Sequence, residues 1–192
     1  MKVVALMSSG IDSPVAIYLM LQKGLHVIPV HFRQDFIKEK KVFELVEVLK
    51  GYGEIEEPLV IDFSEEHIPT FERLREFGEE QWTCVVCKWL MLRRACREGK
   101  SRDALAIITG DSLGQVASQT LDNLAIISTA SDLPVLRPLI GLDKEEVVSI
   151  ARAIGTFEVS SRPEGPCPFV PRHPVIRGSH RKFEKLLKLL NL

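Results

Sequence analysis

The sequence predicts an α/β fold in which a parallel five-stranded sheet lies between two layers of helices. Short apolar segments rich in β-branched residues alternate along the chain with segments whose apolar residues recur at helical spacing. Glycines stand where helical segments end, as at Gly24, Gly51 and Gly155. Because strands that alternate with helices pair in parallel, this order of segments indicates a three-layer α/β sandwich.

The individual elements follow from these patterns. Strands are predicted at Lys2–Met7, His26–Phe32, Leu59–Phe63, Ala104–Ile108 and Val135–Leu136. Helices are predicted at Asp12–Gln22, Val42–Lys50, after Pro69, Val86–Arg97, Ser112–Leu124, Lys144–Ile154 with an Asp143 cap, and Ser179–Leu190. We expect one domain over residues 1–178, with residues 179–192 forming an amphipathic helix that packs on it or on a partner.

Composition narrows the classes of function. The chain has 192 residues, 45 % of them hydrophobic and 27 % charged, which is typical of a globular domain and argues against disorder. The net charge of −1 gives no global attraction to nucleic acid. No apolar run reaches membrane-spanning length, and Met1 is followed at once by a short strand, so we expect a cytoplasmic protein.

The segment Ser8–Ser13 follows the first predicted strand and opens the first helix. Unpaired backbone N–H groups and the helix dipole favour an anion at such a turn, and small residues let phosphate approach the backbone. Asp12 is out of place in a simple anion site, but a carboxylate beside phosphates is explained if it holds Mg²⁺. An ordinary helix N-cap would explain only one or two of these six residues.

The loop Ser-Ser-Gly-Ile-Asp-Ser resembles the pyrophosphate loop of the PP-loop ATP pyrophosphatases. More closely, the chain resembles the catalytic domain of the tRNA 4-thiouridine synthetases. Three further segments carry that resemblance: Cys84–Met91 (CVVCKWLM), Thr109–Leu124 (TGDSLGQVASQTLDNL) and Leu136–Thr156 (LRPLIGLDKEEVVSIARAIGT). It implies a Rossmann-like sheet of the adenine nucleotide alpha hydrolase type, and a tRNA sulfurtransferase that adenylates a uracil carbonyl oxygen before sulfur displaces AMP.

The resemblance also implies site residues. Contacts to ATP fall on Leu6, Met7, Ser8, Ser9, Gly10, Ile11, Ser13, His31, Phe32, Lys88, Gly110 and Gln119. Asp12 would bind Mg²⁺, and Cys167 would handle sulfur. Ser9 stands where the family has glycine, so we expect strain there if the position needs a positive φ.

The family's RNA-binding region precedes the loop, whereas the loop here begins at residue 8. We therefore expect tRNA to be bound through a separate RNA-binding subunit or an oligomer such as a homodimer, with a sulfur donor as a further partner. The basic tail Arg172–Lys188 is the best local candidate for RNA phosphates, although a solvated helix face explains it equally well. Two alternative functions are thiolation or adenylation of a small non-tRNA substrate, and a non-catalytic ATP- or AMP-binding subunit.

Three interpretations of Cys84, Cys87 and Cys167 compete. In the first, Cys167 carries a persulfide and another cysteine resolves it as a disulfide. In the second, the three thiols hold an iron–sulfur cluster with an open iron site. In the third, all are structural thiols. Cys96 is predicted to belong to the core.

Two charged residues near the predicted site have competing interpretations. Asp111 is expected to cap a helix at Ser112, with a role near Mg²⁺ as the minor alternative. Arg137 is expected to meet a phosphate or to pair with an acid such as Asp143.

Overall fold

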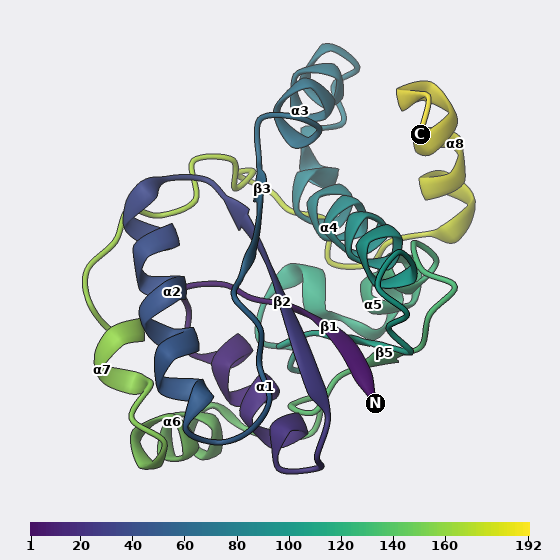
Figure 1. Ribbon diagram of the computed structural model, residues 1–192. Helices are drawn as coiled ribbons and strands as arrows, with labels where there is room; N and C mark the ends of the chain where they lie inside the picture. Colours follow the sequence, from purple (N-terminus) through teal and green to yellow (C-terminus); the bar gives the residue numbers. More distant parts are fainter.

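The computed structural model describes residues 1–192 as one sheet with helices on both faces (Figure 1). The strands are β1 (Lys2–Leu6), β2 (His26–Arg33), β3 (Leu59–Asp62), β4 (Ile107–Ile108) and β5 (Val135–Leu136). All pairs are parallel, in the order β3-β2-β1-β4-β5. The predicted fold class is confirmed, and β1 lies at the centre of the sheet.

Helices form a layer on each face of this sheet. One layer holds α1 (Asp12–Leu21), α2 (Phe36–Lys50), α6 (Lys144–Ala153) and α7 (Phe157–Ser160); the other holds α3 (His67–Glu76), α4 (Thr83–Lys100), α5 (Leu121–Ser128) and α8 (His180–Leu190) (Figure 1). Two 3₁₀ turns, η1 (Glu80–Trp82) and η2 (Ala117–Gln119), complete the elements. None of the helices is long and apolar enough to cross a membrane.

The two layers enclose two separate cores because side chains alternate across a strand. In β1, Val3 and Ala5 pack under α1 and α2, whereas Val4 packs under α4. All three are at most 2 % exposed. Burial of β1 on both faces fixes its position, and so fixes the start of the loop that follows it.

The first turns of α2 and α4 differ from the predictions. Helix α2 begins at Phe36, six residues earlier than predicted, because Asp35 accepts a hydrogen bond from the Lys38 N–H and caps it. Helix α4 begins at Thr83, which places Cys84 and Cys87 inside a helix. The predicted cap of α6 is confirmed, since Asp143 and Glu146 form a capping box.

The predicted helix Ser112–Leu124 is wrong. Residues 112–116 form an irregular loop in which Gly114 has a positive φ of 76°, a conformation that ends helical geometry. Helix α5 starts only after Thr120, whose hydroxyl accepts from the Asn123 N–H. The loop turns two polar residues, Ser118 and Gln119, into the interior instead of onto a helix face.

Helix α8 packs on the same chain. Phe183, Leu186 and Leu190 are buried, and the Phe183 ring lies 5.8 Å from the Trp82 ring. Arg73 of α3 donates to the Leu189 carbonyl at 2.8 Å, at the C-terminal end of α8. A domain boundary at residue 178 stays a prediction.

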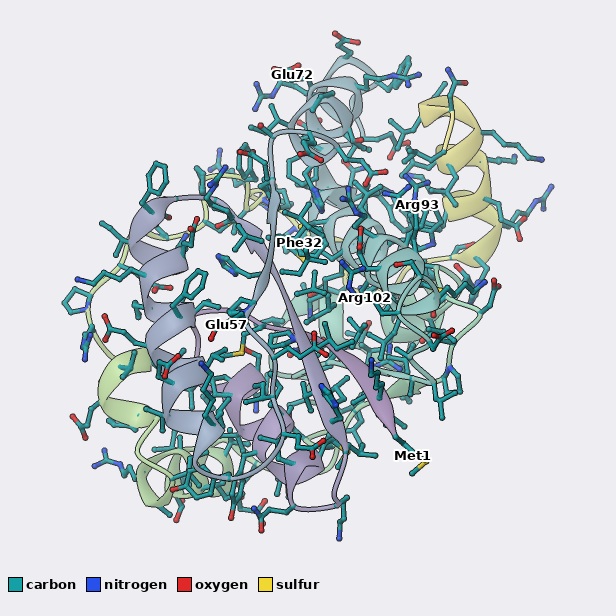
Figure 2. All side chains as sticks on the ribbon, in the orientation of Figure 1. Met1, Phe32, Glu57, Glu72, Arg93 and Arg102 are labelled. Atoms are coloured by element: carbon teal, nitrogen blue, oxygen red, sulfur yellow. The ribbon has the colours of Figure 1, made fainter.

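In Figure 2, Glu72 marks the outer surface of the adjoining helix α3, while Phe32 lies inside the molecule.

Candidate active site

A cavity of about 590 Å³ opens at the carboxyl ends of the parallel strands. Its walls come from the segments that follow β1, β2 and β4, from α4, and from residues 164–167. Ligands of open parallel sheets bind at this edge.

The loop after β1 is held by short contacts between its own serines. The Ser13 hydroxyl accepts from the Ser8 N–H at 2.9 Å and lies 3.0 Å from the Ser8 hydroxyl. The Gly10 N–H donates to the Ser8 hydroxyl at 3.3 Å. No side chain caps the N-terminus of α1, in contrast to α2 and α6 on the same face. This helix end is therefore free to donate to an anion in the cavity.

Gly110 lies where only a glycine fits. A Cβ added there would lie 2.8 Å from the Ser13 nitrogen and 2.9 Å from its Cα, both backbone atoms of the first turn of α1. The segment after β4 can thus touch the phosphate loop without a side chain between them.

Ser9 is not strained. The non-glycine residues with positive φ are Asp103 and Asn191, so the condition under which strain was expected at Ser9 is not met. The loop needs no left-handed residue at this position, and serine adds a hydroxyl where glycine has none. That hydroxyl donates to Glu164 Oε1 at 3.0 Å, and Ser9 is only 4 % exposed.

Asp12 lies at the start of α1, and its side chain is 28 % exposed. Its Oδ1 accepts from the Lys144 ammonium at 2.6 Å, and Lys144 is the first residue of α6. Sequence reasoning missed Lys144. Its only sequence signal is its place directly after the cap Asp143, which says nothing of its distance to a residue 132 positions earlier.

Asp111 does not cap a helix, since none begins at Ser112. Its carboxylate accepts from Lys88 at 2.7 Å and from the Thr109 hydroxyl at 2.8 Å. Arg137 lies 3.4 Å away, so Arg137 pairs with Asp111 and not with Asp143. Burial raises the pKa of Asp111, but Lys88 and the other partners outweigh it and hold that pKa below its ordinary value.

Two buried polar atoms at the cavity lack a partner. His31 Nδ1 lies 3.0 Å from the Met7 carbonyl, which leaves Nε2 without a hydrogen bond. Gln119 Nε2 reaches Asp111 at 3.4 Å, while its Oε1 is unpaired. Burial lowers the pKa of His31, so its ring is neutral at pH 7. Unpaired buried polar atoms beside a cavity are available to a polar ligand that enters it.

Of the three thiols predicted for the site, Cys167 lines the cavity, and Cys84 and Cys87 lie near it on α4. The Cys167 sulfur lies 3.7 Å from Gln34 Nε2. Burial raises the pKa of Cys84 and of Cys87, and the neighbouring Cys167 raises both further. All four cysteines are free thiols, and the predicted core position of Cys96 is confirmed by its 6 % exposure.

The cavity brings together most of the residues predicted for the site. It is lined by Leu6, Met7, Ser8, Ser9, Gly10, Asp12, Ser13, His31, Phe32, Lys88, Gly110, Gln119 and Cys167, and not by Ile11, Cys84 or Cys87. Sequence reasoning missed Gln34, Lys38 and Glu164 on the same walls. No three His, Cys, Asp or Glu side chains are arranged to hold a single metal ion.

The model of one protein family, described as thiamine biosynthesis protein (ThiI), matches residues 1–192. The chain belongs to the ThiI family. A probable tRNA sulfurtransferase of Thermococcus kodakarensis is 51 % identical over 188 residues, which cover 96 % of this chain and 49 % of that protein. One of Methanocaldococcus jannaschii is 42 % identical over 191 residues, covering 100 % of this chain and 50 % of that protein. The ThiI-family chain thus spans about half the length of these relatives.

Two solved structures share the fold of this ThiI-family chain. A 4-thiouridine synthetase–RNA complex with bound ATP matches with a TM-score of 0.90 and 32 % identity, covering 99 % of this chain and 50 % of that one. The NMN synthetase of Francisella tularensis matches with a TM-score of 0.58 and 14 % identity, covering 99 % of this chain and 83 % of that one, which supports the fold alone.

Proposed function

We propose that this chain is the ATP-pyrophosphatase part of a tRNA sulfurtransferase that forms 4-thiouridine. One observation carries the proposal: the uncapped start of α1, with its serine loop, opens into the same cavity whose wall holds Cys167. A phosphate-binding loop and a thiol in one cavity suit a reaction that first uses ATP and then sulfur. The names of the relatives and of the ATP-bound neighbour support the substrates.

In the first step, uridine O4 attacks the α-phosphorus of ATP, and the bond to the bridging oxygen breaks to release pyrophosphate. The backbone N–H groups of Ser8–Ser13 that are not already bonded within the loop would hold the pyrophosphate, where the helix dipole stabilises its growing negative charge. Lys144, already placed 2.6 Å from Asp12, would add a positive charge there. His31 Nε2 and Gln119 Oε1 would complete their hydrogen bonding on the nucleotide.

The residues present fit Mg²⁺ that arrives with the nucleotide. Mg²⁺ is commonly held by one or two carboxylates together with substrate phosphates, so a site built by the protein alone is not required. Asp12 is the carboxylate at the phosphate loop. When bound, Mg²⁺ would neutralise charge on the phosphates.

In the second step, a sulfur nucleophile attacks C4 and the C4–O bond breaks, so that AMP leaves. A Cys167 persulfide that attacks C4 leaves its outer sulfur on the base, joined to Cys167 by a disulfide. Cys84 or Cys87 then attacks the Cys167 sulfur, which frees the thiolated base and forms a protein disulfide that a thiol reductant must reopen. Cys167 is the one thiol of the three on the cavity wall, which suits it to carry sulfur.

An iron–sulfur cluster would use the same three cysteines. Cysteine thiolates are the usual ligands of such a cluster, but the three thiols are not arranged as a metal site in this structure. A cluster would supply sulfide from an open iron site. Anaerobic purification followed by an absorption spectrum and an iron assay tests this alternative, because a colourless, iron-free, fully active protein rules out the cluster.

Recognition of tRNA is proposed to depend on a separate RNA-binding subunit or a homodimer, with a sulfur donor as a further partner. The basic residues of the tail, among them Arg172, Arg177 and Arg181, are exposed and available to RNA phosphates.

The test is release of AMP and pyrophosphate from ATP with tRNA and a sulfur source, which is sulfide in one assay and a persulfide donor with a thiol reductant in the other. Asp12→Ala is expected to slow both by at least about a hundredfold, the usual effect of removing one electrostatic group from such a site. Asp122→Ala is the matched control, because Asp122 is exposed on α5.

With the persulfide donor, Cys167→Ser is expected to keep pyrophosphate release but to form no thiolated tRNA. Full turnover in Asp12→Ala, or full ATP turnover without tRNA, contradicts the proposal.

A further inference from the structure

Lys41 is a buried lysine that the reaction above does not use. It lies on α2, and its side chain is 4 % exposed. Its ammonium group donates to the carbonyls of Ser160 and Arg162 at 3.0 and 3.1 Å and to Glu164 Oε2 at 2.6 Å. A lysine ammonium has three donors, so every one is used. One side chain thus fixes the backbone and the carboxylate of the segment that leads to Cys167.

The same segment touches the phosphate loop twice. The Ser160 hydroxyl donates to the Gly10 carbonyl at 3.2 Å. Glu164, held by Lys41 through one oxygen, accepts from the Ser9 hydroxyl with the other at 3.0 Å. Gly165, Pro166 and Cys167 follow directly and line the cavity beside Glu164. The position of the thiol is therefore tied to the loop through one carboxylate.

A phosphate in the loop conflicts with that contact for two reasons. The Ser9 hydroxyl has a single hydrogen, so it cannot donate to Glu164 and to a phosphate oxygen together. A polyphosphate at the loop also places negative charge beside the Glu164 carboxylate, and like charges in a partly buried site repel strongly. Lys41 contacts the other carboxylate oxygen, Oε2, so losing the Ser9 contact does not itself remove the bond between Lys41 and Glu164.

We propose that Glu164 is a positioning residue that couples the phosphate loop to Cys167: it holds the Cys167 segment on the loop when the loop is empty, and releases it when pyrophosphate binds. The inference rests on pyrophosphate binding by Ser8–Ser13, as proposed above. With the loop filled, residues 165–167 lose their tether to Ser9 and Cys167 becomes more accessible. Sulfur chemistry is then available only at a loop occupied by ATP or by the pyrophosphate just cleaved from it.

The test measures the alkylation rate of Cys167 by iodoacetamide, peptide by peptide in the mass spectrometer, with and without saturating pyrophosphate. In the unmodified chain, pyrophosphate is expected to raise this rate about tenfold, the effect of losing one hydrogen bond to a charged group. Buried Cys96 serves as the internal reference, and its rate is expected to stay constant.

Glu164→Gln should abolish most of this dependence, because a neutral amide is not repelled by pyrophosphate. Glu158→Gln, an exposed position on α7, is the matched control and should keep the tenfold ratio. A merely structural role for Glu164 would change the rate equally in both conditions and leave the ratio unaltered.

Calorimetric titration with pyrophosphate separates the two proposals. If pyrophosphate binds but the Cys167 rate stays constant or falls, the coupling is overturned and the proposed function stands. If the ratio survives in Glu164→Gln, Glu164 is not the coupling residue. If pyrophosphate does not bind at all, the proposed function and the coupling fail together.

Discussion

The phosphate loop and the Cys167 segment face the same cavity but are built in opposite ways. Ser8–Ser13 is held by hydrogen bonds that span five residues or fewer between its own serines. The Cys167 segment is held by contacts to Ser9, Gln34 and Lys41, which lie more than a hundred positions earlier in the chain. The loop therefore has a local framework of its own in addition to its contacts with Ser160 and Glu164, whereas the thiol is placed by tertiary structure and can be displaced by changes elsewhere.

Of the substitutions considered, loss of Lys41 should have the largest effect on the folding free energy, because Lys41 holds the Cys167 segment. Lys41→Met leaves Glu164 without its cation and two carbonyls without a donor, and is expected to cost about 3 kcal/mol of folding free energy, at the low end for a broken buried pair because Glu164 is partly hydrated. Urea unfolding measures it. Lys40→Met, at an exposed neighbouring position, should cost almost nothing. An equal loss of folding free energy in both variants would show that the buried contacts of Lys41 have no special role.

Gly110→Ala tests the close contact between the segment after β4 and the phosphate loop Ser8–Ser13. Its Cβ would meet backbone atoms of Ser13, which cannot rotate away, so we expect a cost of about 2 kcal/mol and weaker ATP binding. Gly141→Ala is the control, since nothing lies within 4 Å of a Cβ there. Thermal unfolding and ATP titration of the two variants give the comparison, and unchanged ATP affinity in Gly110→Ala would mean that the loop tolerates a shift.

His67 packs against the rings of Phe32, Phe63 and Phe71, and its titration makes the stability of the protein sensitive to acid. It stacks on Phe63 at 4.2 Å, neither ring nitrogen has a partner, and burial lowers its pKa to about 4 from 6.5. In the unfolded chain His67 is protonated below about pH 6.5, whereas in the folded chain it is protonated only below about pH 4. Stability is therefore lost as pH falls through that window.

The loss between pH 7 and pH 5 is expected to be on the order of 1–2 kcal/mol. His67→Phe removes the titrating group and should flatten this part of the profile, as measured by urea unfolding at both pH values. An unchanged slope in the variant would assign the loss to other groups.

The smallest effect is expected from Gln34→Leu. Its contact with Cys167 is long at 3.7 Å, so removing it should change the Cys167 alkylation rate by about threefold, which is under 1 kcal/mol. Pyrophosphate release should stay unchanged, because Gln34 is not part of the phosphate loop. A large fall in pyrophosphate release would mean that the phosphate loop and the Cys167 segment are coupled through further residues besides Glu164.

Local structure explains what the sequence could and could not predict. The loop at Ser8–Ser13 was predictable because its contacts lie between near neighbours, directly after a buried strand. The segment Ser112–Leu124 was misassigned because its spacing resembles a helix, while Gly114 and the cap at Thr120 divide it. These two residues were readable in the sequence as a helix break and a helix start.

The tertiary contacts were not readable. Nothing in the sequence links Asp12 to Lys144, or Lys41 to Glu164, because each pair is separated by more than a hundred residues. Asp111 shows the same limit: a carboxylate after a strand suggests a cap, but its partners Lys88 and Arg137 come from other elements. Lysines and acids are common on surfaces, so their burial has no local sequence signature.

The central place of β1 has a consequence for hydrogen exchange. This strand pairs with β2 on one side and β4 on the other, whereas the edge strands β3 and β5 each have one neighbour. Its amides should therefore exchange only when the whole domain unfolds, while edge-strand amides exchange through local opening. The phosphate loop starts from this strand, so it should keep its shape through every partial opening of the domain.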